Sequence, residues 1–351
     1  MANYSTQRWD AFKYKLNAAM SAPEFRKSPA PTLQTLLGNT NFLVPASEKE
    51  RILGTKQSDQ DTVAVKILNK QNISVTNARA AAHTGSKNDG TSVNATFTTY
   101  TANYGYSLKE SDRTIWELAE IQAKQILSAI IALHEDIESG LVTWMNTNKS
   151  QVVESLTPRS GAWDATNYKF QVANADFNRW MQRVKGFMRE QKYKGTYEMI
   201  ADELLYQEGE FLVQQGQGNS TNLAWQAGGI NAMVSQNITV DSGSLGSGFV
   251  FPTGTAGILP WIPKLNRMGF GDAGANGGFY TTLQDPFGTG LTFAVHERYV
   301  AADNEGASGE TQDVNVFVEI SVDLAPLKAV MSTATASPIF RFDVLAAGGS
   351  N

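Results

Sequence analysis

The sequence predicts an α+β chain, from one long helical pattern and several short alternating patterns. Apolar residues keep helical spacing through residues 107–147, whereas apolar and polar residues alternate at 62–67, 291–295, 316–322 and 340–344. A period of about 3.6 residues is typical of helices, and a period of two is typical of strands. Since no internal repeat and no clean linker occurs, we predict one α+β body with projecting segments.

Composition favours a protein that associates with other chains. The chain has 351 residues, and 42% of them are hydrophobic, which allows a sizeable core. Only 18% are charged, below the roughly 25% usual for soluble domains. A net charge of -5 excludes a strongly cationic nucleic-acid binder. Cysteine is absent, so neither disulfides nor cysteine metal sites hold the fold.

Residues 1–45 are predicted to be an N-terminal arm. An amphipathic helical pattern is followed by prolines, which disfavour helix just before them. A lone amphipathic helix cannot bury its apolar stripe, so the arm needs another surface. The first residues lack the layout of a signal peptide, and no run approaches 18 apolar residues, so we predict a cytosolic chain without a membrane partner. The pattern consists of Trp9, Phe12, Leu16 and Met20, with the prolines Pro23, Pro29 and Pro31.

The arm is also basic. Five cations stand against Asp10 and Glu24 between residues 1 and 30. A solvated helix face is the simpler interpretation, and contact with nucleic acid is the functional one. The candidates for that contact are Arg8, Lys13, Lys15, Arg26 and Lys27.

Residues 46–106 are predicted to be an extended β-arm. Val63, Val65 and Ile67 alternate with polar or small residues, and residues 93–106 are rich in Thr and Tyr. A lone hairpin is marginal in water, so an arm of this kind needs support from outside itself.

The strongest local pattern predicts a long helix within residues 107–147. Ser107 and Glu110 fit a capping box at its start. About 35 helical residues make a rod of roughly 50 Å, which we interpret as a spine for other parts. Its apolar positions are Ile115, Leu118, Ala119, Ile126, Ile130, Leu133, Ile137, Leu141 and Met145.

The remainder mixes helices and strands. Helices are expected after Asp176 and after Asp202, and glycine-rich loops are expected to dominate residues 214–290. Strands resume at residues 291–295, 316–322 and 340–344.

Residues suited to catalysis are few. Of the three histidines, His134 is expected at the solvent edge of the long helix, His296 on the exposed side of a strand, and His83 in a flexible segment. The glycine clusters lack the Lys-Ser/Thr ending of a phosphate loop and are interpreted as turns. Six carboxylates and no Lys or Arg occur between residues 300 and 325, which favours a solvated acidic rim over a calcium site. We predict no catalytic, cofactor or metal site, and no enzyme.

The order of these parts resembles the Hong Kong 97-like (HK97-like) capsid fold of tailed phages. The resemblance implies an N-terminal arm at 1–45 and an E-loop at 46–106. It implies a peripheral domain at 107–170, with a spine helix and C-terminal strands at 314–345, and an axial domain at 171–313.

Three passages carry this resemblance at the level of residues. Residues 96–108, running into the helix that contains 133–137, resemble the junction between E-loop and spine. Residues 227–237 resemble a short hairpin of the axial domain, and residues 337–342 resemble a closing strand.

The resemblance implies a major capsid protein that assembles into hexamers and pentamers of an icosahedral head around double-stranded DNA. It implies assembly in the host bacterial cytoplasm, a place in the virion, separate scaffold and portal proteins, and decoration proteins. We expect no N-terminal cleavage, and no crosslink is assigned to a lysine of the arm. The expected contacts between subunits are Val63, Val65, Ile67, Phe97, Tyr100 and Tyr104.

Two alternatives stay open. An encapsulin-type nanocompartment would share the fold and enclose protein cargo. A tail-associated carbohydrate-binding or carbohydrate-active protein belongs to another class, in which Trp163, Trp225 and Trp261 would stack on sugars.

Overall fold

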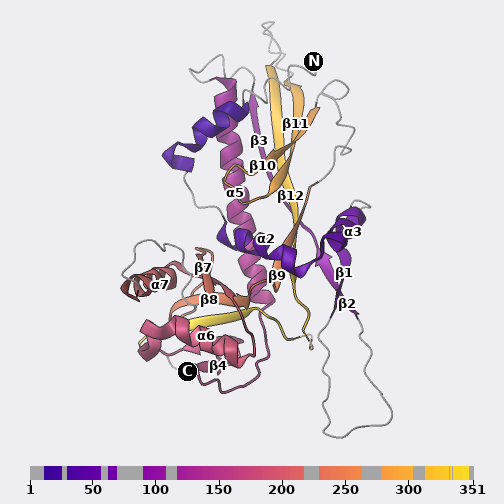
Figure 1. Ribbon diagram of the computed structural model, residues 1–351. Helices are drawn as coiled ribbons and strands as arrows, with labels where there is room; N and C mark the ends of the chain where they lie inside the picture. Colours follow the sequence, from indigo (N-terminus) through magenta and orange to yellow (C-terminus); the bar gives the residue numbers. More distant parts are fainter. Residues whose placement is uncertain are drawn as a thin grey trace, which may run out of the picture. The chain divides into compact units, whose positions relative to one another are not determined.

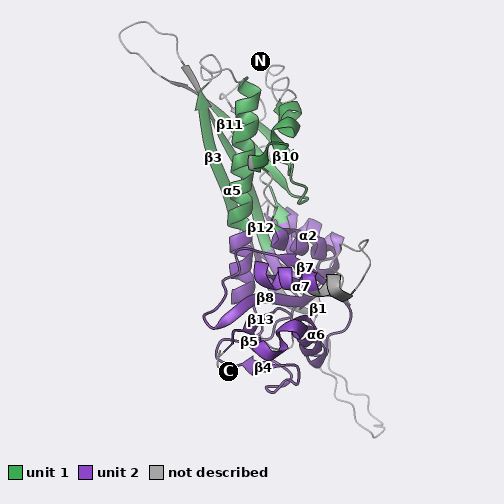
Figure 2. Cartoon of the chain, turned by 90° about the vertical axis from the view of Figure 1, so that its left-hand side faces the viewer, with its two compact units in different colours: residues 1–30, 97–137, 260–325 green, residues 31–96, 138–259, 326–351 purple. Residues whose placement is uncertain are grey.

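The computed structural model describes residues 12–25, 30–56, 62–68, 90–107, 117–216, 229–262, 278–302, 313–331, 333 and 335–347. The chain forms two compact units, each built from three separate segments (Figure 2). Unit 1 contains residues 1–30, 97–137 and 260–325. Unit 2 contains residues 31–96, 138–259 and 326–351.

Unit 1 combines an antiparallel sheet with the first part of the long helix. The strand order is β10-β11-β12-β3. A further strand, β9 (Ala256–Trp261), whose residues up to 259 belong to unit 2, pairs with β12 off this path. Residues 12–20 are helical and are followed by the short helix η1 (Pro23–Phe25). The strands are β3 (Thr98–Ser107), β10 (Gly278–Gln284), β11 (Thr292–Ala302) and β12 (Asp313–Lys328).

The long helix α5 (Leu118–Thr147) lies along this sheet within unit 1 (Figure 1). Gln122 Nε2 donates a hydrogen bond to Glu297 Oε1 of β11 over 2.9 Å, and both side chains are buried. The helix and the strands pack against each other because the apolar residues of each recur at its own period and so lie on one side of it. The buried apolar residues are Ala123, Ile126, Leu127, Ile130, Leu133 and Ile137 of α5 and Val316, Val318, Ile320 and Val322 of β12.

Unit 2 is built on a six-stranded mixed sheet of order β4-β5-β13-β8-β6-β7. β13 runs parallel to β5 and antiparallel to β8, and β6 runs parallel to β7. The strands are β4 (Ala162–Asp164), β5 (Lys169–Val172), β6 (Tyr197–Ala201), β7 (Ile230–Val234), β8 (Ser244–Pro252) and β13 (Phe340–Leu345).

Two helices pack on this sheet. The short helix η2 (Asn174–Arg179) leads into α6 (Trp180–Glu190), and α7 is Glu203–Gly216. The aromatic centre of the core is Phe187, whose ring centroid lies 4.2 Å from that of Phe170 and 5.3 Å from that of Phe340. These contacts confirm the two helices expected after Asp176 and Asp202.

The first segment of unit 2, residues 31–96, contributes two described helices and a hairpin. Helix α2 (Pro31–Leu43) begins at a proline, which suits a first helical position since its missing N–H would be unpaired there. Helix α3 (Ala46–Lys56) precedes β1 (Thr62–Leu68), which pairs antiparallel with β2 (Gly90–Thr96).

The structure differs from the sequence-based prediction in residues 46–106, which were predicted to be an extended β-arm. Residues 46–56 are helical rather than extended, and residues 98–107 form β3, which pairs with β12 along ten residues. Only β1 and β2 form a separate hairpin. Helix α5 begins at Leu118, Ser107 ends strand β3, and the predicted helical positions Glu110 and Ile115 lie outside the described residues.

Residues 214–290 were expected to be mostly loops, yet they hold strands β7 to β10. Two of the glycines interpreted as turns lie inside β8. A Cβ at Gly248 would come within 2.6 Å of Phe342 Cζ, and one at Gly246 within 2.5 Å of Leu205 Cγ. These glycines admit neighbouring side chains over the strand, whereas Gly243, with φ of +86°, is a turn glycine as predicted.

Two strand assignments also change. The described residues 229–237 hold the single strand β7, which pairs in parallel with β6 instead of forming the expected hairpin. The C-terminal residues 314–345 do not complete one domain, because β12 and β13 belong to different sheets. Strands β10 and β11 pair toward β12, not with the sheet of unit 2.

Candidate assembly surfaces and polar networks

The β1–β2 hairpin is supported by helix α3 of the same unit. Val63 and Val65 of β1 are each 1% exposed, and Ile52 of α3 is fully buried. Arg51 Nη2 donates a hydrogen bond to the carbonyl of Ala64 over 2.6 Å. The hairpin is therefore supported by a helix of the same 46–106 segment, whereas the segment was expected to be an extended arm that needs support from outside itself.

The outward side of the hairpin is polar. Thr62 and Ala64 of β1 are exposed, as are Asn94 and Thr96 of β2. In the register of the two strands, Thr62 stands opposite Thr96 and Ala64 opposite Asn94. This side presents hydroxyl and amide groups rather than an apolar stripe.

The predicted contact residues fall into different places. Val63, Val65 and Phe97 are buried, and the side chain of Ile67 lies outside the described residues. Tyr100 and Tyr104 are half-buried on β3, opposite Val322 and Val318 of β12. Their role between subunits stays a prediction, and the buried three are not exposed surface in the single chain.

The basic arm is only partly described. Lys13 is exposed, whereas Lys15 Nζ lies 2.8 Å from Glu120 Oε1 and 3.0 Å from Glu117 Oε2. The hydrogen bond to Glu120 raises the pKa of Lys15. Lys15 is thus engaged by carboxylates, which weakens the case for its contact with nucleic acid. Arg8, Arg26 and Lys27 lie outside the described residues.

A denser basic cluster escaped the sequence analysis. Residues 179–194 carry six cations and a single carboxylate, Glu190, and so exceed the N-terminal arm in basic character. The apolar periodicity of the same stretch predicts a helix and its buried side, but not the cations on its other side. The cations are Arg179, Arg183, Lys185, Arg189, Lys192 and Lys194.

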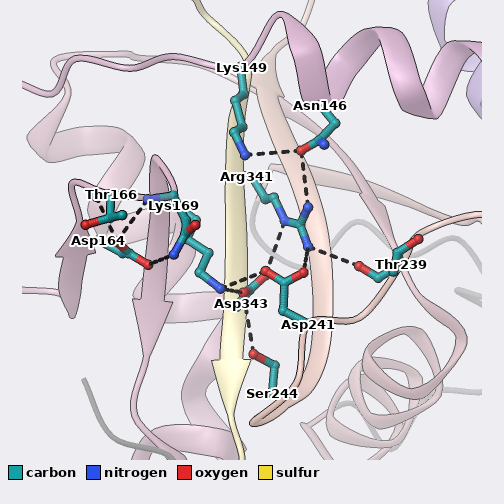
Figure 3. A network of polar contacts seen from close by, with 11 residues as sticks. Asn146, Lys149, Asp164, Thr166, Lys169, Thr239, Asp241, Ser244, Arg341 and Asp343 are labelled. Carbon is teal, nitrogen blue, oxygen red and sulfur yellow. Dashed lines mark hydrogen bonds and ion pairs between the residues drawn. The ribbon is translucent and has the colours of Figure 1, made fainter.

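Unit 2 contains a buried ion network at β13 (Figure 3). Lys169 Nζ lies 2.5 Å from Asp343 Oδ2 and 2.8 Å from Asp241 Oδ2. Arg341 Nη2 lies 2.9 Å from Asp241 Oδ1, and its Nη1 donates to Asn146 Oδ1 over 3.1 Å. The network joins β5, β13, the end of α5 and the chain before β8, so it fixes strands that are distant in the sequence.

Protonation within this network follows from the pairing. Burial lowers the pKa of Lys169, but its bonds to Asp241 and Asp343 outweigh burial, so the net pKa is raised. Burial raises the pKa of Asp241, and the two cations reverse that effect and leave it lowered. Both groups are therefore held in their charged forms.

Glu138 ties α5 to α2 within unit 2. Its buried carboxylate accepts hydrogen bonds from the Thr32 backbone N–H, the Thr32 hydroxyl and the Ser235 hydroxyl. Thr32 is the second residue of α2, so the carboxylate satisfies an N–H that the helix leaves unpaired. Burial raises the pKa of Glu138 despite these bonds.

His134 is not at the solvent edge of α5, as predicted, but is 5% exposed. Its Nε2 lies 2.9 Å from Asp285 Oδ2, and the Thr289 hydroxyl donates to the same carboxylate. The rings of Phe287 and Phe293 lie 5.7 and 6.1 Å from the imidazole, between ring centroids. His134 thus belongs to the core of unit 1.

We expect replacement of Asp285 by asparagine to lower the free energy of unfolding by about 1.5–3 kcal/mol at neutral pH. Burial raises the pKa of Asp285, but the bonds from His134 and Thr289 leave it lowered. A lowered carboxyl pKa stabilises the fold above its unfolded value and loses that effect as pH falls through the folded value. Urea unfolding between pH 2 and 7 should therefore show a difference between the variants that shrinks in acid. A difference independent of pH would contradict the pairing.

Two further expectations are corrected. The side chain of His296 is 13% exposed and packs with Tyr280 at a centroid distance of 4.7 Å, so it is not openly exposed. Trp163 is half-buried against the core of unit 2, and its ring stacks on Phe187 at a centroid distance of 6.1 Å, so it is not a fully exposed platform for a sugar. Trp225 lies outside the described residues.

Within the described ranges, no group of three or more His, Cys, Asp or Glu side chains is arranged to hold a metal ion. Among the helices of those ranges, none combines the length and apolar character needed to cross a bilayer.

Comparison with known proteins gives similarity at the level of structure only. No family model matches the chain, and no curated protein matches it. A structure from Mycobacterium phage Che8 is 9% identical, with a TM-score of 0.47, and the match covers 87% of this chain and 90% of that one. The capsid of cyanophage P-SCSP1u is 10% identical, with a TM-score of 0.42, and the match covers 82% and 84%.

The holo-SrpI encapsulin complex from Synechococcus elongatus PCC 7942 is 13% identical, with a TM-score of 0.43 and coverage of 81% of both chains. Phage capsids and an encapsulin are thus among the solved structures to which this chain is similar along more than four fifths of its length.

Proposed function

We propose that this chain is a major capsid protein of a tailed phage, with an HK97-like fold. One observation carries the proposal, namely the order of elements along the chain. A helical N-terminal segment, a β-hairpin, a strand and a 30-residue helix follow one another, and the strands of the six-stranded sheet come after them in the sequence. This is the order of the N-terminal arm, E-loop, spine helix and axial domain in that family.

The parts take the following roles in the proposal. The hairpin β1–β2, with residues 69–89 between its strands, is the E-loop and lies across a neighbouring subunit. Helix α5 is the spine. The sheet of unit 2 with α6 and α7 forms the axial part. The subunits associate into hexamers and pentamers, and many weak contacts add up through multivalency.

The proposal places the protein in the icosahedral head of the virion, after assembly in the host bacterial cytoplasm. Its partners are other copies of itself, a separate scaffold, a portal, decoration proteins and the packaged double-stranded DNA, which it contacts without sequence preference. The chain performs no enzymatic reaction in this role.

The decisive experiment is electron microscopy of the purified, overexpressed chain. We expect closed shells or rings of capsomers, and a stable globular monomer would overturn the proposal. The contents of the shells separate the two uses of the fold, since nucleic acid supports a phage head and a protein cargo supports an encapsulin.

A hairpin variant tests the proposed E-loop directly. Replacing residues 70–88 by Asn-Gly keeps β1 and β2 and supplies a tight turn between them. We expect this variant to melt within a few degrees of the parent subunit and to form no shells. Normal shells from the shortened variant would contradict the proposed overlap between subunits.

A further inference from the structure

A basic pocket lies at the C-terminal end of α6, and we call it the α6 pocket. It is separate from the N-terminal arm and from the ion network at β13. Among the described residues that line it, four are cations and none is a carboxylate. The lining residues are Lys185, Arg189, Lys192, Tyr193, Lys194, Gly195 and Tyr197.

The fold brings these cations together by two means. Lys185 and Arg189 are four residues apart on α6 and therefore share one side of the helix. The other side is fixed in the core by buried residues such as Val184 and Phe187. After the helix ends, Lys192 and Gly195 take the left-handed backbone region with φ of 63° and 103°, which turns the chain back so that residues 192–195 line the same pocket.

The positive charge of the pocket is only partly neutralised. Glu190 is occupied elsewhere, since its carboxylate accepts hydrogen bonds from the Ser160 hydroxyl at 2.7 Å and the Arg159 backbone N–H at 3.1 Å. Lys192 Nζ pairs with Glu154 over 2.7 Å at the surface. Within the described part of the chain, the side chains of Arg189 and Lys194 have no ion-pair partner. Two exposed cations are therefore available to an anion from outside.

The two tyrosines line the pocket, but their hydroxyl groups donate to other groups of the protein and not to a ligand. The Tyr197 hydroxyl donates to the carbonyl of Tyr193 over 2.9 Å, and the Tyr193 hydroxyl lies 3.8 Å from Met331 Sδ. Burial raises the pKa of Tyr193 to about 12, so it adds no negative charge. The pocket therefore combines the half-buried Tyr193 with the exposed cations Arg189 and Lys194. This combination suits an anion that carries apolar groups beside its charges, as a sugar-phosphate chain does.

We propose that the α6 pocket binds the phosphodiester backbone of nucleic acid. The inference rests on the proposed function, in which the shell encloses DNA. A contact from Lys or Arg to a phosphate oxygen carries no sequence information, because sequence is distinguished at the base edges in the grooves. The contact is therefore independent of sequence and sensitive to salt.

The test compares two double variants of the full-length, unassembled subunit. Arg189→Gln/Lys194→Gln removes the two unpaired cations of the pocket, and Lys124→Gln/Arg298→Gln removes two exposed cations of unit 1. Fluorescence anisotropy measures binding to fluorescein-labelled duplexes of two unrelated sequences between 50 and 300 mM NaCl. Thermal melting followed by circular dichroism checks that each variant is folded.

We expect the pocket variant to bind both duplexes about tens of times more weakly at 0.1 M salt, with a salt slope smaller by about two. The control variant should stay within about threefold of the parent. An unchanged affinity of the folded pocket variant would overturn the proposal, as would an equal loss in the control.

Two further arms identify the occupant. Inorganic phosphate is titrated against the parent and the pocket variant, and a peptide copying residues 300–313 is tested as an acidic protein segment. The proposal would be overturned if the parent binds one of these probes, the pocket variant does not, and neither binds DNA. Binding of phosphate would then indicate a small-anion site, and binding of the peptide would indicate a second copy of the chain. Electron microscopy of the same variants keeps the two proposals apart. If the parent chain forms shells but does not bind DNA, the proposal for the α6 pocket is wrong and the capsid proposal stands. If the parent chain binds DNA through the pocket but forms no shells, the capsid proposal is wrong and the pocket proposal stands.

Discussion

Replacement of Asp343 by alanine should lower the free energy of unfolding by about 3–5 kcal/mol, because it removes one of the two carboxylates that pair with the buried cations and leaves them only Asp241. Asp343 is fully buried, and its carboxylate lies 2.5 Å from Lys169 Nζ, with Arg341 Nε at 3.5 Å. The side chains of the two cations are only 8% and 10% exposed, so water cannot replace the lost partner. Urea denaturation followed by circular dichroism measures the change.

A surface pair in the same unit provides the control. Asp176 pairs with Arg183 over 2.9 Å, but both side chains are about one third exposed. Asp176→Ala should cost at most about 1 kcal/mol, since exposed pairs contribute little. The double variant Lys169→Met/Asp343→Leu should recover much of the loss, because apolar side chains can replace a buried pair. A cost below about 1 kcal/mol for Asp343→Ala would contradict the network's role.

The second large effect is expected from Phe187→Ala, at about 3–5 kcal/mol. Phe187 is fully buried and lies within stacking or edge contact of Phe170, Phe340 and Trp163. Truncation removes apolar burial and leaves a cavity that the surrounding rings can fill only in part. The midpoint of urea unfolding should fall, with the dependence on urea unchanged.

Phe211 is the matched control for this substitution. It lies on α7 of the same unit and is 52% exposed. Phe211→Ala should stay within about 0.5 kcal/mol of the parent, as exposed substitutions usually do. Equal costs for the two phenylalanines would mean that α6 does not pack on the sheet as described.

The His134–Asp285 pair shows how far local spacing predicts a buried polar contact. His134 was expected to be exposed, yet it lies four residues after Ile130 and three before Ile137, which places it on the buried side of the helix. The helical spacing therefore indicates burial of His134, whereas the polar character of histidine favoured the wrong prediction of exposure. The carboxyl that receives it, Asp285, is 151 residues later, so no local pattern indicates the pair.

The cations of the α6 pocket were predictable in part. Their number is plain in residues 179–194, and the helical spacing of Lys185 and Arg189 puts them on one side. Their convergence depends on the turn at Lys192 and Gly195, where a non-glycine residue adopts positive φ. A lysine gives no indication of that conformation, because only surrounding contacts hold it there.

The sequence by itself determined the elements whose apolar period is strong. These are the long helix, α6, α7, the alternating strands β11, β12 and β13, and the β1–β2 pattern. Only the tertiary structure decided that β3 leaves the hairpin segment to pair with β12, and that β12 and β13 enter different sheets. The reason is physical. Period and propensity act over neighbouring residues, whereas backbone hydrogen bonds between strands are alike for every residue. The choice of strand partner is therefore set by packing and buried charge across the whole chain.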